Sequence, residues 1–256
     1  MPYSNFDKKC IELLYEAPPR HSRHCFASSL YHLEKAEVLA SMDNEMAIFR
    51  AITAEEEAAT GLMHCLKELN YNNAKKLKVR DHLTKSAVIP FINVILSNLG
   101  ATIGNKFGDV VMKIDRESES ALLTIGMPLK NCGVDLMAWP QPPLNLYIKS
   151  DEKKLSYKKS LSELMAEKGK RDVITYVKEL ANERNKLLYA SPKGIPIVTG
   201  SCSDYIDKRR SRVLVLLRAF LLIYPYKEKQ PLVQDSLDSF LAMLGSIDYE
   251  GFHESN

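Results

Sequence analysis

The chain has 256 residues, of which 45% are apolar, and its 35 basic side chains nearly balance its 32 acidic ones. This composition excludes disordered, collagen-like and low-complexity chains. A chain of this length buries enough surface to fold without disulfides or a structural metal ion. We therefore expect one globular domain that spans residues 1–256.

The net charge of +3 is unevenly distributed along the sequence. Residues 234–256 contain five acidic and no basic side chains, so the first 233 residues carry a net charge of +8. Basic residues gather in three segments, at 75–85, 153–159 and 208–212. Such clusters either bind phosphate groups or form ordinary solvated helix faces.

The sequence also bears on the cellular compartment. The first twenty residues lack the basic, apolar and small-residue pattern of a secretory signal peptide. The most apolar stretch, Val213–Tyr224, contains Arg218 and is shorter than the roughly twenty residues needed to span a bilayer. Five cysteines without a Cys-x-x-Cys pair are typical of free thiols. We expect a cytoplasmic protein with no membrane partner.

Apolar residues at helical spacing dominate the first hundred residues. The clearest helix starts at a cap formed by Asp43 or Asn44, and its apolar residues recur at intervals of three or four. Pro18 and Pro19 end the first helix, because the residue before a proline disfavours the α conformation. The pattern predicts four helices, at 5–16, 22–41, 44–70 and 74–99.

The hydrophobic period changes between residues 100 and 150. Three runs of β-branched, aliphatic or aromatic residues are separated by Gly, Pro and Asn, a pattern typical of short strands. These runs are Asp109–Asp115, Ala121–Ile125 and Leu144–Ile148, with Trp139–Pro143 as an extended connection. We interpret residues 100–150 as a β-rich insertion that forms a small antiparallel sheet or a hairpin.

Helical spacing returns after the insertion. It is present from about Lys153, again at Arg171–Ala190, and in the apolar segment Asp204–Tyr224. A last amphipathic helix precedes Gly245, and the acidic residues 246–256 are expected to form a loose tail. The predicted fold is mainly α with a small β-rich insert.

Two ionisable residues occupy positions where the helical pattern requires apolar ones. Glu56 lies within about 40° of Ile52 on the third helix, inside its apolar stripe. Arg184 lies within about 20° of Val173 on a later helix, again inside the stripe. A charge buried alone is too costly, so we expect Glu56 and Arg184 to meet. The contact is either a structural ion pair or part of a cleft that binds an anion.

The residues around Arg184 resemble a known family. The segment Glu183–Tyr189 (ERNKLLY) resembles the Arg-x(4–6)-His signature of the HEPN superfamily, in which Asn commonly follows the Arg. The segments Ala51–Met63 (AITAEEEAATGLM) and His82–Lys85 (HLTK), followed by Leu-Tyr at 188–189, are similar to the AbiV-type abortive-infection branch. The resemblance covers residues 25–99 and 155–225 and leaves out the β-rich insert.

The resemblance implies an antiparallel helical bundle that often forms a homodimer, in which two Arg motifs form one composite cleft. Active members of the family cleave RNA without a metal ion and leave a cyclic phosphate. In that cleft Arg184 would stabilise the phosphate, Asn185 would orient a contact and Glu56 would hold Arg184. Tyr189 stands where the family has its catalytic histidine. An unperturbed tyrosine, with a pKa of about 10, is a poor base near pH 7, although Tyr189 can still donate a hydrogen bond.

Further candidate residues lie in the first half of the fourth helix. Arg80, His82 and Lys85 are candidate binding residues for RNA, and His82 approaches the cleft if that helix packs there. The local group of His21, His24, Cys25 and His32 lacks a second ligand pair at zinc spacing. We therefore expect no metal site and no cofactor.

Three functions remain open on the sequence alone. The first is a prokaryotic, toxin-like antiviral-defence protein that binds or cleaves RNA in a dimeric cleft. The second is a non-catalytic module that binds a protein partner through the helical dimer and the β-rich insert, with Tyr189 as a lost catalytic histidine. The third is a nucleotide sensor that uses Arg184 to bind a phosphate.

Overall fold

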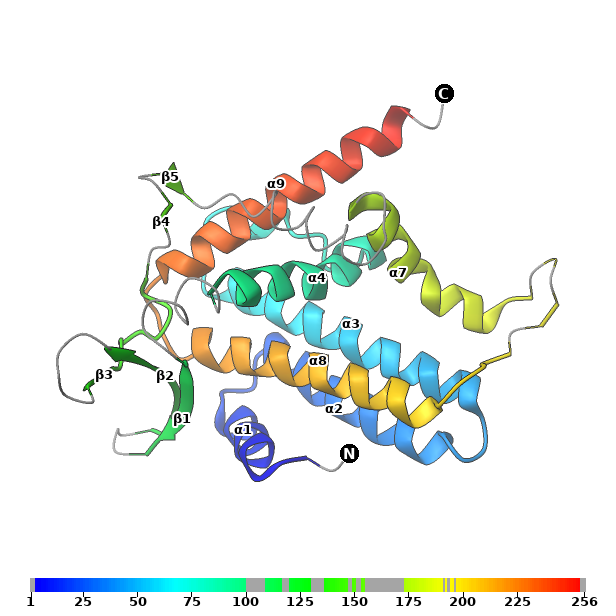
Figure 1. Ribbon diagram of the computed structural model, residues 1–256, viewed down its shortest axis with the longest axis horizontal. Coiled ribbons are helices and arrows are strands. Elements are labelled where there is room, and N and C mark those ends of the chain that lie inside the picture. The colour runs from blue at the N-terminus through cyan, green and yellow to red at the C-terminus, as the bar shows by residue number, and fades with distance from the viewer. Residues whose placement is uncertain are drawn as a thin grey trace. The chain divides into compact units, whose positions relative to one another are not determined.

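The computed structural model describes residues 3–99, 109–116, 120–129, 136–146, 149–150, 153–154, 173–190, 192, 194–195 and 197–253. Within these ranges the protein is mainly helical and carries a small three-stranded antiparallel sheet, as the sequence predicts (Figure 1). The chain divides into two compact units. The first comprises Met1–Cys65, Lys78–Ile89 and Thr175–Phe220, and the second comprises Leu66–Leu77, Pro90–Ile174 and Leu221–Asn256.

The first unit is built from helices. It contains α1 (Asn5–Glu16), α2 (His21–Leu39), most of α3 (Asn44–Glu68), the first two turns of α4 (His82–Leu99), nearly all of α7 (Val173–Leu188) and most of α8 (Cys202–Ile223).

Local hydrogen bonds explain where helices of the first unit begin. At α1, Asp7 N–H donates to Ser4 Oγ at 3.1 Å, and Ser4 N–H donates to the Asp7 carboxylate at 3.0 Å. This reciprocal capping box satisfies two amides that the helix itself cannot bond. At α3, Met46 N–H donates to Asp43 Oδ1 at 2.9 Å, so Asp43 is the capping residue.

The core of the first unit lies between α2, α3 and α8, which run side by side (Figure 1). Small buried residues of α3 allow close packing: a Cβ added at Gly61 would lie 2.8 Å from the Phe26 ring of α2. The Phe26 ring in turn packs on Phe220 of α8 with the ring centroids 4.9 Å apart. Ser29 Oγ donates to the Ala54 carbonyl at 2.6 Å, which satisfies a buried hydroxyl at the same interface.

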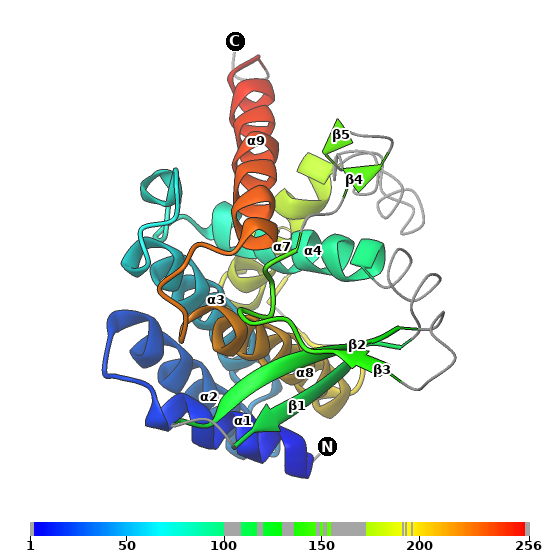
Figure 2. The same cartoon turned by 90° about the vertical axis from the view of Figure 1, so that its left-hand side faces the viewer.

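The second unit contains the sheet, whose strand order is β1-β2-β3 (Figure 2). Strand β2 (Leu122–Leu129) pairs antiparallel with β1 (Val111–Asp115) and with β3 (Leu136–Ala138). Gly126 is required in β2 because an added Cβ would lie 2.6 Å from the Trp139 ring. A further pair, β4 (Lys149–Ser150) and β5 (Lys153–Lys154), has two residues in each strand.

Helix α9 (Pro231–His253) and the short 3-10 helix η1 (Ala74–Lys76) also belong to the second unit. Phe240 of α9 packs on Phe91 of α4 with centroids 5.2 Å apart. Gln230, which is buried, donates to the Leu222 carbonyl at 2.9 Å and accepts Leu144 N–H at 2.7 Å. A single buried amide therefore connects the end of α8 with the segment that follows the sheet.

Some local expectations differ from the structure. The first two strands are confirmed, but residues 144–146 of the expected third strand lie in a turn and its continuation, and residues 147–148 lie outside the described residues. The third strand is β3, a segment whose sequence lacks a β-branched run. Lys153 begins β5 rather than a helix, and the rest of that expected helix is outside the described residues. Helix α9 continues past Gly245 to His253.

Among the residues that the structure describes, no helix is both long enough and apolar enough to cross a membrane.

Candidate functional site

Glu56 lies on the buried side of α3, as its place in the apolar stripe predicts. Only 6% of the residue is exposed. An ionised carboxylate at such a position needs cationic or hydrogen-bonding partners, because burial removes its hydration. Two side chains from other segments of the first unit supply them: His82, the first residue of α4, and Arg184 of α7.

We call Glu56, His82 and Arg184 the Glu56 triad. His82 Nδ1 lies 2.9 Å from Glu56 Oε1, and Arg184 Nη1 lies 3.5 Å from Glu56 Oε2. Arg184 Nη1 is also 3.5 Å from His82 Nε2. The predicted contact between Glu56 and Arg184 is therefore confirmed, and His82 completes a three-way contact that the sequence only suggested.

The partners of His82 determine its tautomer. An ionised carboxylate only accepts hydrogen bonds, so Nδ1 of His82 carries the hydrogen that Glu56 accepts. A guanidinium only donates, so Nε2 of His82 presents its lone pair to Arg184. The ring thus has one nitrogen anchored by a buried carboxylate and the other nitrogen free to accept a proton.

The Glu56 triad is open to solvent on one side. The exposed fraction of the side chain rises from 8% for Glu56 to 31% for Arg184 and 48% for His82. The Arg184 guanidinium stacks on Phe49, with Cζ 4.9 Å from the ring centroid, and its Nε is buried without a hydrogen-bond partner. The long contacts and the partial exposure of the side chain leave the Arg184 guanidinium able to bind an additional anion.

Asp81 positions His82 at the start of α4. Its carboxylate accepts Thr84 N–H at 2.8 Å and Thr84 Oγ1–H at 2.6 Å. Burial alone would raise the pKa of Asp81, but these hydrogen bonds outweigh it and hold the pKa below its ordinary value. The cap fixes the first turn of α4 and with it the backbone of His82.

The other predicted site residues do not join the triad. Tyr189 is 67% exposed, and Asn185 is also exposed; the two residues are joined by a backbone hydrogen bond from Tyr189 N–H to the Asn185 carbonyl at 3.2 Å. Arg80 is exposed and Lys85 is partly buried. Among the described residues, neither cation forms an ion pair with Glu56. Lys85 lies three residues after His82, on the same side of α4.

A second charged cluster lies beside the triad in sequence. It contains Arg209 and Arg212 of the basic segment 208–212, which form ion pairs instead of the expected phosphate site or solvated helix face. We call it the Glu55 cluster. Glu55 Oε2 accepts Arg209 Nη1 at 2.7 Å and Arg212 Nη1 at 3.1 Å. Arg209 also binds the Glu183 carboxylate and donates to the Tyr205 hydroxyl at 2.5 Å. The helical spacing of Arg209 could have indicated its burial, because Arg209 falls three residues after buried Ile206 and four before buried Val213.

The Glu55 cluster is closed and electrostatically saturated. The Arg209 side chain is 7% exposed. Burial alone would lower the pKa of Arg209, but Glu55, Tyr205 and Glu183 raise it above the ordinary value. Burial, assisted by Glu183, raises the pKa of Tyr205 and keeps its hydroxyl protonated. The cluster therefore joins α3, α7 and α8 and presents no free charge to a ligand.

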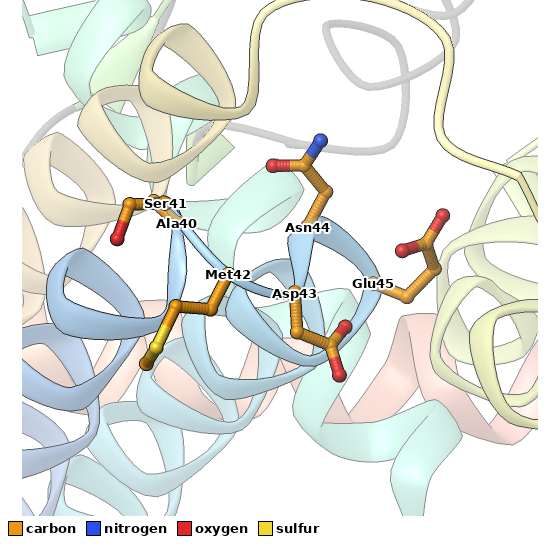
Figure 3. Close-up of a pocket in the computed structure, with 6 residues that line it drawn as sticks. All are labelled: Ala40, Ser41, Met42, Asp43, Asn44 and Glu45. Carbon is orange, nitrogen blue, oxygen red and sulfur yellow. The ribbon is translucent and has the colours of Figure 1, made fainter.

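The loop between α2 and α3 encloses a separate surface hollow of about 450 Å³ (Figure 3). Its polar side chains already have structural roles: Asp43 caps α3, and Glu45 Oε1 accepts Val198 N–H at 2.9 Å. The six lining residues point away from one another rather than converge (Figure 3). This arrangement does not make a binding site.

Other reactive groups within the described residues form no centre. No group of three His, Cys, Asp or Glu side chains there is arranged to hold a metal ion. His21 stacks on His64 with ring centroids 3.9 Å apart. Burial raises the pKa of the Cys10 thiol to about 11, which makes it a weak nucleophile.

Comparisons of the chain with protein-family models, with curated proteins and with solved structures found no match. The geometry of the Glu56 triad is therefore the main basis for a functional proposal.

Proposed function

We propose that the protein is an antiviral-defence endoribonuclease of HEPN type, in which the Glu56 triad cleaves RNA without a metal ion. The observation that carries the proposal is the half-exposed side chain of His82, whose Nε2 lies 3.5 Å from Arg184 while Nδ1 is held by buried Glu56. A general base and a phosphate-binding cation are thus side by side.

The proposed reaction uses the ribose 2′-hydroxyl as nucleophile. His82 Nε2 accepts the proton of that hydroxyl, and the 2′-oxygen forms a bond to the adjacent phosphorus. The bond from phosphorus to the 5′-oxygen breaks, and the leaving oxygen takes a proton from water. The products are a 2′,3′-cyclic phosphate and a 5′-hydroxyl. Arg184 stabilises the extra negative charge on the phosphate oxygens.

His82 can act as the base at a site where Tyr189 replaces the histidine of the family. The family resemblance places the catalytic histidine at position 189, where this chain has an exposed tyrosine. His82 belongs to another helix but supplies the same chemical group next to Arg184. Glu56 acts as a positioning residue for both partners, and Arg80 and Lys85 are candidate contacts for flanking phosphates.

The experiment is cleavage of a labelled single-stranded RNA by the purified protein in the presence of EDTA. We expect products that end in a cyclic phosphate, and we expect His82→Gln and Arg184→Met to slow cleavage by about a hundredfold or more. Tyr189→Phe should cleave at nearly the wild-type rate, because Tyr189 does not contact the triad.

Two results would contradict this proposal. One is cleavage that EDTA abolishes, which would require a metal ion. The other is equal activity of the wild type and the His82→Gln variant, which would assign the cleavage to a contaminant or to another site. The mass of the protein in solution, measured by light scattering, tests the proposed homodimer separately.

A second candidate function is binding of a protein partner through the β-rich insert. Apolar side chains are exposed on the two outer strands and beside β1, namely Val110, Val111, Leu136 and Met137. Exposed apolar groups on strands with a free edge are suited to pairing with another chain. Under this function, Val111→Lys combined with Leu136→Lys would abolish partner capture and leave RNA cleavage unchanged.

A further inference from the structure

Arg50 of α3 carries a positive charge that no carboxylate neutralises within the described residues. Its guanidinium Nη1 donates to His32 Nδ1 of α2 at 3.1 Å, and its Nε is buried without a hydrogen-bond partner. Glu34, the acidic residue closest to His32 in sequence, forms no ion pair with Arg50. A partly buried, unneutralised cation is costly, and it becomes favourable when an anion binds beside it.

His32 is held as a neutral donor next to this charge. Arg50 only donates, so Nδ1 of His32 accepts and Nε2 carries the hydrogen. Burial lowers the pKa of His32, and the Arg50 guanidinium lowers it further. The pair thus offers guanidinium N–H groups and one imidazole N–H, and no acceptor that would repel an anion.

An aromatic side chain and a second cation lie next to this pair on α2. The Tyr31 ring is half exposed and meets the His32 ring edge-on, with centroids 6.1 Å apart. Lys35 Nζ lies 5.2 Å from the Tyr31 ring centroid. We call Tyr31, His32, Lys35 and Arg50 the Arg50 patch. An exposed aromatic ring with a lysine over it, next to a histidine that contacts an arginine, is an arrangement that can stack a base and bind its phosphate.

We propose that the Arg50 patch is a subsite for single-stranded RNA, in which Arg50 and His32 bind one phosphate and Tyr31 stacks on a neighbouring base. Arg50 follows Phe49, the residue that supports Arg184, so both sites are attached to consecutive residues of α3. The proposal deepens the function above and rests on it for the identity of the ligand. Duplex RNA does not fit the patch, because its bases are already stacked.

Binding is measured by fluorescence anisotropy with a labelled 2′-O-methyl oligouridine, which the triad cannot cleave because it has no free 2′-hydroxyl. Arg50→Met should weaken binding by about tenfold and reduce the slope of log K against log salt by about 0.7, the value for one lost phosphate contact on a single strand. Tyr31→Ala should weaken binding by about tenfold through the loss of stacking.

The matched control is Arg20→Met, which removes one exposed guanidinium at the start of α2, away from the patch. It should leave oligouridine affinity within about twofold of the wild type. Double-stranded RNA of the same length should show no effect of Tyr31→Ala. If Tyr31→Ala weakens duplex binding equally, the stacking role is overturned.

The melting temperature distinguishes an arginine that binds a ligand from an arginine that stabilises the fold. Because Arg50 is unneutralised, Arg50→Met should melt at the same temperature as the wild type or higher. Inorganic phosphate should raise the melting temperature of the wild type more than that of Arg50→Met. If the Met variant does not fold, Arg50 is structural and the proposal is overturned. Arg50→Lys, which keeps the charge but loses the planar fork, should bind more weakly with an unchanged salt slope.

Cleavage of a dinucleotide distinguishes failure of this inference from failure of the proposed function. We expect a dinucleotide bound at the Glu56 triad to leave the Arg50 patch empty, so Arg50→Met should cleave it at the wild-type rate and cleave a longer strand more slowly. If no RNA is cleaved but Arg50→Met still weakens oligouridine binding, the subsite stands without the nuclease. If Arg50→Met and Arg20→Met bind equally, the subsite is overturned even where cleavage is observed.

Discussion

Glu55 and Glu56 are consecutive residues of α3 with the same 6% exposure, yet they belong to very different surroundings. Glu55 contacts two arginines of α8, and Arg209 also engages Glu183 and Tyr205. Glu56 contacts a half-exposed histidine and an arginine at 3.5 Å. Equal burial therefore does not imply an equal role. The number and length of a buried carboxylate's contacts decide whether any capacity for a ligand is left.

The same division occurs on α7. Glu183 points to the Glu55 cluster and Arg184 points to the Glu56 triad. Each of α3 and α7 thus contributes one residue to a closed structural cluster and the next residue to an open one. The closed cluster holds the helices in register, and the open triad depends on that register for its geometry.

The largest difference is expected on removing the arginine from each cluster. Arg209→Met leaves two buried or partly buried carboxylates without their shared cation and should lower the free energy of unfolding by about 3 kcal/mol. Arg184→Met removes a partly exposed cation with long contacts and should cost less than about 1 kcal/mol. Urea unfolding followed by circular dichroism measures both. Equal losses would show that the triad is also a structural ion pair.

The adjacent glutamates provide the next comparison, with one substitution at two equally buried positions. Glu55→Gln leaves Arg209 and Arg212 facing an uncharged amide, and we expect a loss of about 2 kcal/mol. Glu56→Gln keeps an oxygen that accepts from His82, so its loss should be about 1 kcal/mol. RNA cleavage should show the opposite order, with Glu56→Gln the slower variant. The comparison fails if Glu55→Gln is the slower one.

A smaller effect concerns the cap that positions His82. Asp81→Ala should lower the free energy of unfolding by about 1 kcal/mol, the usual contribution of an N-cap. The pKa of Asp81 is lower in the folded protein than its ordinary value of 3.8, so its stabilisation is complete above that pH and is lost as the pH falls below it. Asp81→Asn should keep the cap and remove the acid dependence. Unfolding curves at neutral and acidic pH measure this dependence, and an acid dependence that persists in Asp81→Asn would contradict the prediction.

The smallest effect extends the comparison to Arg50, a cation without a carboxylate among the described residues. Burial and Arg50 lower the pKa of His32, so Arg50→Met should raise that pKa toward, but not to, its ordinary value of 6.5. Folded His32 binds a proton less readily than unfolded His32, so the free energy of unfolding decreases as the pH falls below about 6.5. This decrease should be smaller in Arg50→Met than in the wild type. NMR titration of the imidazole protons measures the shift; an unchanged pKa would mean that burial alone is responsible.

Most of the helices could be predicted from the sequence because their cause is local, although the helix expected at 74–99 begins only at His82, after the 3-10 helix η1. Asp43, the apolar spacing of α3 and the two prolines after α1 are visible in any printed sequence, and the structure begins and ends those helices close to the predicted residues. β3 could not be predicted, since its pairing with β2 rather than its composition makes it a strand. The expected meeting of Glu56 and Arg184 followed from the cost of burying either charge alone.

The mainly helical fold and the positions of Glu56 and Arg184 on apolar stripes follow from the sequence alone. Side-chain periodicity and the cost of desolvation can be evaluated without knowing which residues pack together. Which histidine lies beside Arg184 depends instead on how the helices pack. His82 and Arg184 are 102 residues apart along the chain, and their contact at 3.5 Å depends on how the start of α4 and α7 pack on α3. The same packing places Glu55 and Glu56 in different clusters and leaves Arg50 beside His32, where no carboxylate of the described residues neutralises it.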